Sequence, residues 1–217
     1  MLNKNIKNMN LYLTSTFANV AISFVDIFNL VPSENKVAFI ANASDIYSEH
    51  PWTYLDHSKL VELGFIVEDI DLRIVQGDEL RQRLSDVDII FVAGGNVTYL
   101  LNIARTSGFI EIVSELVQHG KIYVGSSAGS ALTGPSIEPF YNDEQLKLKE
   151  TGHDIVLTDF TALGFVDFVI LPHYDVLKFK QKFDLLREQF KDQFTFLTKE
   201  DDEAVAVREL EIINITN

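Results

Sequence analysis

The sequence predicts an α/β fold, a single three-layer α/β/α domain built on a mostly parallel, doubly wound sheet. Short apolar runs rich in β-branched residues alternate with longer amphipathic segments. Gly and Pro residues separate many of these segments. The run 88–93 (DIIFVA) is apolar after its first residue, as expected for a central parallel strand that is buried on both faces. Together these patterns favour β-α-β units with helices on both faces of one sheet.

The first 124 residues show this alternation most clearly. Pro32 ends the first helix, and Gly64 follows the second helix at a position typical of a C-cap. The third strand alternates apolar and acidic residues. In chain order, strands are expected at 11–14, 36–41, 65–72, 88–93 and 121–124, and helices at 17–30, 52–63, 78–84, 97–104 and 109–119.

The last third of the chain is less regular. Residues 135–159 are polar and rich in turn formers, and we interpret them as an excursion near the site. A strand at 167–172 (DFVILP), a helix at 178–190 and two closing strands at 194–197 and 204–215 follow. Because there is no internal repeat, low-complexity tract or linker, one domain over 1–217 is the simplest organisation.

Composition excludes several classes of function. The chain has 217 residues and a formal net charge of −14, which disfavours binding to nucleic acids and to anionic membranes. It has no Cys, which excludes disulfides, Cys-ligated metals and a cysteine nucleophile. No signal peptide or run of about 18 apolar residues is found, so we expect a cytoplasmic protein. We further expect a monomer or homodimer that uses no cofactor.

The sequence Gly-Ser-Ser-Ala-Gly at 125–129 directly follows a predicted strand, and the helix-compatible segment 130–132 follows it. A G-x-S-x-G sequence in this context forms a sharp turn that exposes the central hydroxyl, here that of Ser127. The small neighbours leave room for the strained backbone, and the following helix start offers free N–H groups to a developing oxyanion. The alternative is a plain Gly/Ser turn.

Gly94-Gly95-Asn96 also lies between a predicted strand and a helix. Two glycines let the backbone approach another group closely, so this turn can supply an oxyanion-hole amide or cradle a substrate carboxylate. It is neither a phosphate-binding loop nor a dinucleotide fingerprint, because the Lys-Ser/Thr ending and the third glycine are missing. A tight turn without function is the other interpretation.

His173 is the candidate base for Ser127, because it ends the strand 167–172 and should lie at the same edge of the sheet. A structural histidine is the alternative. The other histidines have weaker signals: His119 precedes a glycine at a helix end, and His153 lies in the polar excursion. His50 and His57 flank a helix start.

A third group must orient the histidine. The acids near the last strands are Glu200, Asp201, Asp202 and Glu203, most of which would otherwise form a solvated acidic hairpin. Asp175 is close to His173 in sequence but is expected to point the wrong way unless its loop turns back.

The segments 94–101 (GGNVTYLL), 124–137 (VGSSAGSALTGPSI) and 171–175 (LPHYD) resemble the peptidase E / cyanophycinase family of serine peptidases over nearly the whole chain. This resemblance implies a class I glutamine amidotransferase-like fold with serine at the elbow. It also implies a dipeptidase-like hydrolase that acts on a small peptide with an N-terminal aspartyl residue.

Carried over by position, the resemblance makes Ser127 the nucleophile and His173 the base, with oxyanion amides at Gly95 and Ala128. The triad acid falls on Asp201, with a register uncertain by one or two residues, because the family's glycine is absent there. Asn96 and Asp143 are candidate substrate contacts, and Asp143 matches an Asn-Asp pair of peptidase E.

One position departs from the resemblance. The family's arginine that grips the aspartyl carboxylate falls on Phe179. The neighbouring lysines Lys178, Lys180 and Lys182 could supply a point charge without the bidentate geometry of arginine, and Lys180 is the candidate substrate contact. Aspartyl specificity is therefore less supported than the acyl-transfer machinery.

Three alternatives remain open. An α/β-hydrolase esterase needs an acid between Ser127 and His173, such as Asp154 or Asp159. A binding or regulatory protein could keep the elbow without turnover. A metal site could use His50 and His57 or the acidic residues 200–203, although no recognised ligand spacing is present.

Overall fold

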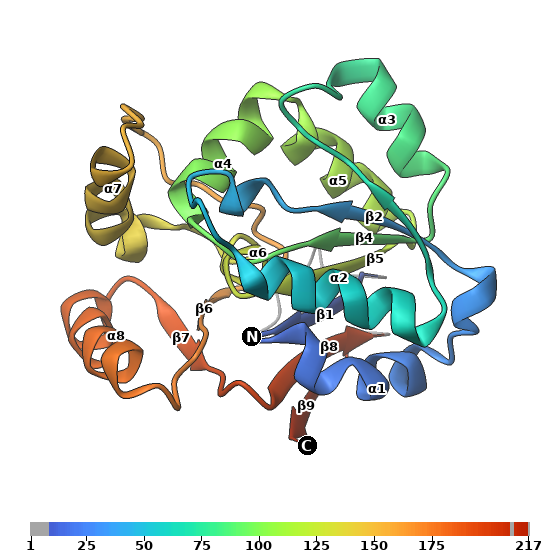
Figure 1. Ribbon diagram of the computed structural model, residues 1–217. Helices are drawn as coiled ribbons and strands as arrows, with labels where there is room; N and C mark the ends of the chain where they lie inside the picture. Colours follow the sequence, from blue (N-terminus) through green and yellow to red (C-terminus); the bar gives the residue numbers. More distant parts are fainter. Residues whose placement is uncertain (1–8, 209–210, 217) are drawn as a thin grey trace.

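The computed structural model describes residues 9–208 and 211–216, and a seven-stranded sheet forms its centre (Figure 1). The strand order is β3-β2-β4-β5-β1-β8-β9. The first five of these pair in parallel, whereas β8 runs antiparallel to β1 and β9 antiparallel to β8. The strands are β1 (Asn10–Thr14), β2 (Lys36–Ile40), β3 (Ile66–Asp69), β4 (Ile89–Val92), β5 (Ile122–Ser126), β8 (Glu203–Arg208) and β9 (Glu211–Thr216).

Helices cover both faces of this sheet (Figure 1). On one face, α1 and α2 pack on strand residues such as Tyr12, Phe39 and Phe91. On the other face, α3, α4 and α5 pack on the alternate residues, such as Leu11 and Ile90. The predicted mostly parallel α/β architecture is confirmed. The helices are α1 (Phe17–Phe28), α2 (Pro51–Leu63), α3 (Gly77–Ser85), α4 (Val97–Thr106), α5 (Phe109–Gln118), α6 (Ala128–Ala131), α7 (Tyr141–Glu150) and α8 (Leu177–Phe190), with 3₁₀ turns at Pro32–Glu34, Asn42–Ser44 and Glu138–Phe140.

The helix ends follow local rules. Gly64 caps α2 in the left-handed region, with φ 97°, as its position after Leu63 predicts. The first helix ends earlier than expected, because Asn29 adopts φ 50° and closes it three residues before Pro32.

The C-terminal third contains the main differences from the sequence-based expectation. The strand after the excursion, β6 (Phe168–Leu171), does not join the central sheet but pairs in parallel with β7 (Thr195–Thr198) in a separate two-stranded sheet. Residues 204–215, expected as one strand, contribute to two antiparallel strands, β8 and β9. The excursion contains a helix, α7, which has one fully buried residue, Leu148, and therefore a weak apolar pattern.

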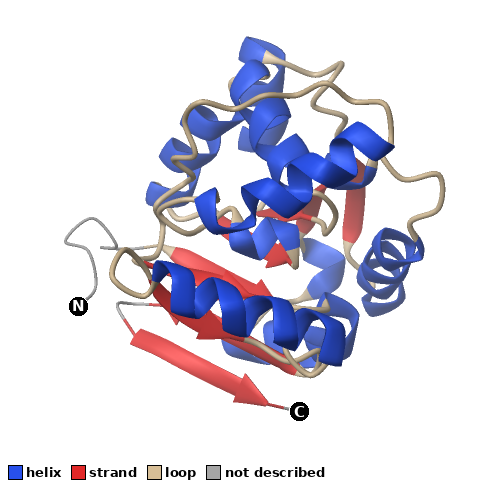
Figure 2. Ribbon diagram, turned by 90° about the vertical axis from the view of Figure 1, so that its left-hand side faces the viewer, coloured by secondary structure: helices blue, strands red, loops and turns tan. Residues whose placement is uncertain are grey.

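Helices α7 and α8 lie next to each other at one end of the molecule (Figure 1). An ion pair between Asp143 on α7 and Lys182 on α8, at 3.1 Å, connects them, and the rings of Phe140 and Phe183 pack edge to face. In the turned view, β9 is the outermost strand of the central sheet (Figure 2). No helix in the described ranges is long and apolar enough to cross a membrane.

Candidate active site

Ser127 occupies the sharp turn between β5 and α6, with φ 50° and ψ −106°. This is a conformation that non-glycine residues rarely adopt, and it is held because the Ser127 N–H donates to the carbonyl oxygen of Thr14 at 2.9 Å. The glycines on either side are required by contact: a Cβ at Gly129 would lie 2.0 Å from the Val92 oxygen, and one at Gly125 would lie 2.6 Å from the Ser130 nitrogen.

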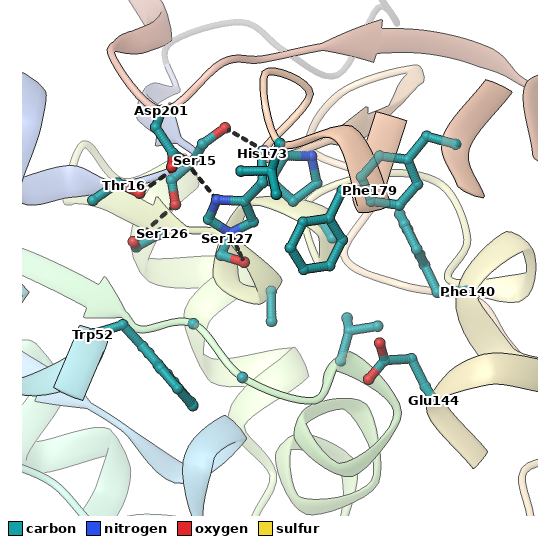
Figure 3. Close-up of a pocket in the computed structure, with 18 of the residues that line it drawn as sticks. Ser15, Thr16, Trp52, Ser126, Ser127, Phe140, Glu144, His173, Phe179 and Asp201 are labelled. Atoms are coloured by element: carbon teal, nitrogen blue, oxygen red, sulfur yellow. Dashed lines mark hydrogen bonds and ion pairs between the residues drawn. The ribbon is translucent and has the colours of Figure 1, made fainter. Parts of the chain in front are cut away.

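A continuous hydrogen-bond chain runs from this serine to an acid (Figure 3). Ser127 Oγ lies 2.9 Å from His173 Nε2, and His173 Nδ1 lies 2.5 Å from Asp201 Oδ1. Because an ionised carboxylate only accepts hydrogen bonds, Nδ1 must carry a proton, which leaves Nε2 of the neutral ring free to accept the serine proton. Of the four acids at 200–203, Asp201 is the one with a hydrogen bond to the His173 ring among the described residues.

The backbone of His173 is also in a strained conformation, with φ 59°. Its N–H donates to Ser15 Oγ at 3.0 Å, and that hydroxyl donates to the Lys199 carbonyl oxygen at 2.8 Å. The Tyr174 N–H donates to the same carbonyl at 3.0 Å. Residues after β1, β6 and β7 therefore hold the histidine turn together, although β6 and β1 belong to different sheets.

Three polar contacts fix Asp201. Thr16 Oγ1 donates to Oδ1 at 3.0 Å, so this oxygen accepts from both the threonine and the histidine. The Asn19 side chain donates to the Asp201 carbonyl oxygen at 3.0 Å. Asp175, whose loop does turn back, accepts from the Asp201 N–H at 3.2 Å. Asp175 thus faces the acid rather than the histidine ring.

The two predicted oxyanion amides flank Ser127 in the same cavity. Ala128 is the first residue of α6, so its N–H has no partner inside the helix. Gly95 has φ 144°, and a Cβ there would lie 2.2 Å from the Ala43 oxygen. The turn is held by Ser44, whose hydroxyl donates to the Gly94 oxygen at 2.7 Å.

The cavity that contains this chain has a volume of about 460 Å³, and its walls come from two parts of the molecule (Figure 3). Trp52 and the turns after the parallel strands form one wall. Helices α7 and α8 with the segments before them form the other wall, which is largely aromatic. The residues of this second wall are Phe140, Glu144, Val176, Phe179, Lys182 and Phe183.

Two carboxyl groups line the cavity: that of Asp56, which is buried, and that of Glu144, which is partly buried and has a buried Oε2 atom. Burial raises the pKa of Asp56 on α2 to about 6, although its carboxylate accepts from the Ala18 N–H at 3.0 Å. Burial raises the pKa of Glu144 on α7 to about 7, against the opposing charge of Lys182. Burial thus makes both groups easier to protonate than an exposed carboxyl group.

The three predicted substrate contacts, Asn96, Asp143 and Lys180, do not line the cavity. The Asn96 side chain is buried, accepts from the Tyr99 N–H at 2.8 Å and donates to the Glu144 carbonyl oxygen at 3.1 Å. Lys180 Nζ lies 4.0 Å from the centre of the Tyr174 ring, and Asp143 pairs with Lys182. None of the three lines the cavity, whereas Lys182 does.

The rival candidates lie apart from the cavity as well. His50, His57, His119 and His153 do not line it, and neither do Asp154 and Asp159. Asp159 pairs instead with Arg105 at 3.1 Å. Among the described residues, no group of three or more His, Asp or Glu is arranged to hold a metal ion.

Sequence reasoning missed Ser15, Thr16, Asp56 and Glu144. A signal existed for the first two, because they follow β1 at the carboxyl edge where ligands of parallel sheets bind. Asp56 and Glu144 lie on helices with weak apolar periodicity, so their inward direction could not be inferred from spacing.

A family model described as peptidase family S51 matches residues 11–215 of the chain. The uncharacterized peptidase Lmo0363 of Listeria monocytogenes is 31% identical over 206 residues, which cover 94% of this chain and 97% of that protein. Peptidase E of Shewanella denitrificans is 32% identical over 157 residues, or 71% of this chain and 59% of its own length.

Two solved structures are similar in fold. A crystal structure from Listeria monocytogenes EGD-e, provisionally described as a peptidase E, superimposes with a TM-score of 0.83 at 29% identity and covers 96% of this chain and 98% of that one. A peptidase from an acI-B1 Actinobacterium superimposes with a TM-score of 0.68 at 15% identity, covering 97% and 90%, which shows similarity of fold alone.

Proposed function

The chain belongs to peptidase family S51 and is a serine peptidase, and from this premise we propose that it hydrolyses small peptides through an acyl-enzyme formed on Ser127. The resemblance to the peptidase E family is thus confirmed, as is the fold class that it implied. The observation that carries the proposal is the contact chain from Ser127 Oγ through the His173 ring to Asp201.

In the acylation step, His173 Nε2 takes the proton of Ser127 Oγ as that oxygen attacks the carbonyl carbon of the scissile peptide bond. The carbonyl oxygen becomes an oxyanion, which the N–H groups of Gly95 and Ala128 stabilise. When the tetrahedral intermediate collapses, the C–N bond breaks and His173 gives its proton to the leaving amine. Asp201 stabilises the protonated ring in between.

Deacylation repeats these steps with water. His173 Nε2 takes a proton from water, whose oxygen attacks the ester carbon, and the same two amides stabilise the second oxyanion. The ester C–O bond then breaks, and the proton returns to Ser127 Oγ. The carboxylic acid product leaves, and the chain is again in its starting state.

The size of the cavity favours short substrates. A volume of about 460 Å³ is typical of small-molecule sites and accommodates one or two residues beside the serine. Dipeptides are therefore the first substrates to test. The resemblance to the peptidase E family implies an N-terminal aspartyl residue in the substrate. Because Phe179 stands at the position of the family's arginine, dipeptides with a neutral first residue must be tested beside aspartyl dipeptides.

The test is hydrolysis of a dipeptide panel with Asp-X, isoAsp-X and neutral members, using the wild type and Ser127→Ala side by side. We expect hydrolysis of at least one member, with kcat reduced by about 10⁴-fold or more in Ser127→Ala. Hydrolysis that persists in Ser127→Ala would contradict the proposed nucleophile. If no member is hydrolysed, failure of a fluorophosphonate to label Ser127 would instead favour a binding protein without turnover.

A further inference from the structure

The aromatic wall of the cavity contains one carboxyl group, that of Glu144. Its side chain extends from α7 toward the space between Phe140 and Phe179, across the cavity from Ser127 (Figure 3). The backbone of Glu144 is held in place, because its carbonyl oxygen accepts from Asn96 in the turn that carries Gly95. This connects the Glu144 position directly to the proposed oxyanion turn.

The carboxyl group of Glu144 is only partly satisfied within the protein, by a hydrogen bond from the Val97 N–H. Its Oε2 atom is buried and has no hydrogen-bond partner among the described residues. The neighbouring cation, Lys182, makes its 3.1 Å ion pair with Asp143 instead. A buried acceptor without a donor destabilises the folded state, and such groups are often retained because a ligand completes them.

The surroundings favour a cationic ligand over an anionic one. Phe179 lies where the resemblance places an arginine, and its ring stacks on that of Phe183 with centroids 6.0 Å apart. The faces of aromatic rings carry partial negative charge, which attracts ammonium groups and repels carboxylates. An anionic aspartyl side chain would meet these rings and Glu144, and the one ammonium group in this wall, that of Lys182, is already paired with Asp143.

We propose that Glu144 binds an ammonium group of the substrate, so that the enzyme selects peptides with a cationic amine at this subsite rather than an N-terminal aspartyl carboxylate. The ammonium donates to Oε2, and the rings of Phe140 and Phe179 surround its alkyl carbons. The group comes from the α-amine of the first residue or from a lysine side chain. That the bound amine belongs to a substrate rests on the proposed function.

Binding is tested without turnover, by calorimetry on Ser127→Ala. Leu-Ala against N-acetyl-Leu-Ala tests the α-amine, and N-acetyl-Lys-Ala against N-acetyl-norleucyl-Ala tests the side chain. Each pair is repeated in Ser127→Ala/Glu144→Gln. The matched control is Ser127→Ala/Glu150→Gln, because Glu150 lies on the exposed side of the same helix.

We expect the amine of at least one pair to bind about 10-fold or more tightly than its uncharged partner, and this preference to disappear with Glu144→Gln but not with Glu150→Gln. A preference unaffected by Glu144→Gln would overturn the proposal. So would no measurable binding of either amine up to about 10 mM, or tighter binding of Asp-Ala than of Leu-Ala.

The outcome separates this inference from the proposed function. If binding depends on Glu144 but the wild type hydrolyses no member of the dipeptide panel, the amine site is supported and the hydrolytic proposal fails. If the panel is hydrolysed but binding ignores Glu144, only the amine site fails. Thermal unfolding of each variant shows whether a lost preference reflects a lost fold.

Discussion

The two walls of the cavity differ in how much their residues can change. The sheet wall is the one formed by Trp52 and the turns after the parallel strands. Gly95 in this wall, and Gly125 and Gly129 on either side of the Ser127 turn, are so close to neighbouring backbone that a single Cβ would overlap it. On the aromatic wall, α7 has one buried residue, Leu148, and α8 has two, Phe183 and Phe190. Most of their side chains therefore contact little that would resist exchange. The difference suggests that the reaction depends on backbone geometry, whereas selection of substrates depends on exchangeable side chains.

The largest effect should come from a change of Asp201, the acid that contacts the His173 ring. Asp201→Asn replaces the carboxylate that accepts the Nδ1 proton with an amide, which favours the wrong histidine tautomer. We expect kcat for the best dipeptide to fall by about 10³–10⁴-fold, with little change in thermal stability. Asp202→Asn, on the same hairpin and exposed, is the control. Equal losses in both variants would mean that the hairpin's charge matters rather than the Asp201 contact.

The next effect tests the rigidity of the sheet wall. Gly129→Ala places a Cβ 2.0 Å from the Val92 oxygen, which lies in β4 and cannot move away freely. We expect the free energy of unfolding to fall by about 3 kcal/mol or more in urea titrations. Gly152→Ala, beyond the end of α7, meets no atom within 4 Å and should cost only about 1 kcal/mol for its positive φ of 81°. Similar losses at both positions would refute the proposed contrast between the walls.

The smallest effect concerns the aromatic wall and depends on pH. Burial raises the pKa of Glu144 to about 7 in the folded state, above its value in the unfolded chain. Between pH 5 and pH 7 the folded state therefore binds more protons than the unfolded state, so stability declines as pH rises through this range. The charged groups that face this carboxyl group are Lys182, which lowers its pKa, and Asp143, which raises it.

Removal of this titration should be measurable. From pH 5 to pH 8, the free energy of unfolding of the wild type should fall by on the order of 2 kcal/mol more than that of Glu144→Gln. Urea titrations at the two pH values give the difference. Asp56, with a pKa of about 6, has the same sign of effect and remains in both proteins, so it cancels in the comparison. A difference of zero would mean that Glu144 is hydrated in the folded state.

The parallel half of the fold was predictable because its signals are local. Runs such as 36–41 and 88–93 are rich in β-branched residues and lie between segments with helical periodicity. Each contains a strand of the central sheet. The partner of β6 was not predictable in this way. Apolar content shows that residues 168–171 are buried, but it does not show which strand lies beside them.

The β8–β9 pair was missed because the sequence at 208–211 contains no Gly, Pro or Asn to indicate a turn. For the site, the elbow and the histidine were predicted from motifs at strand ends, and the structure brings Ser127, His173 and Asp201 into contact. Thr16 and Asp175 both hold Asp201, and their positions after strands could be read from the sequence. Their contacts with Asp201 could not, because both residues are far from it in sequence.

The positive φ of Ser127 also limits which nucleophiles this position can hold. Threonine carries the same hydroxyl group, but its branched Cβ is disfavoured in this backbone conformation. Serine and cysteine have an unbranched Cβ and share the same steric demand. The turn between β5 and α6 therefore accommodates serine or cysteine at position 127 and disfavours threonine. The backbone conformation thus restricts which nucleophile can stand there, independently of its reactivity.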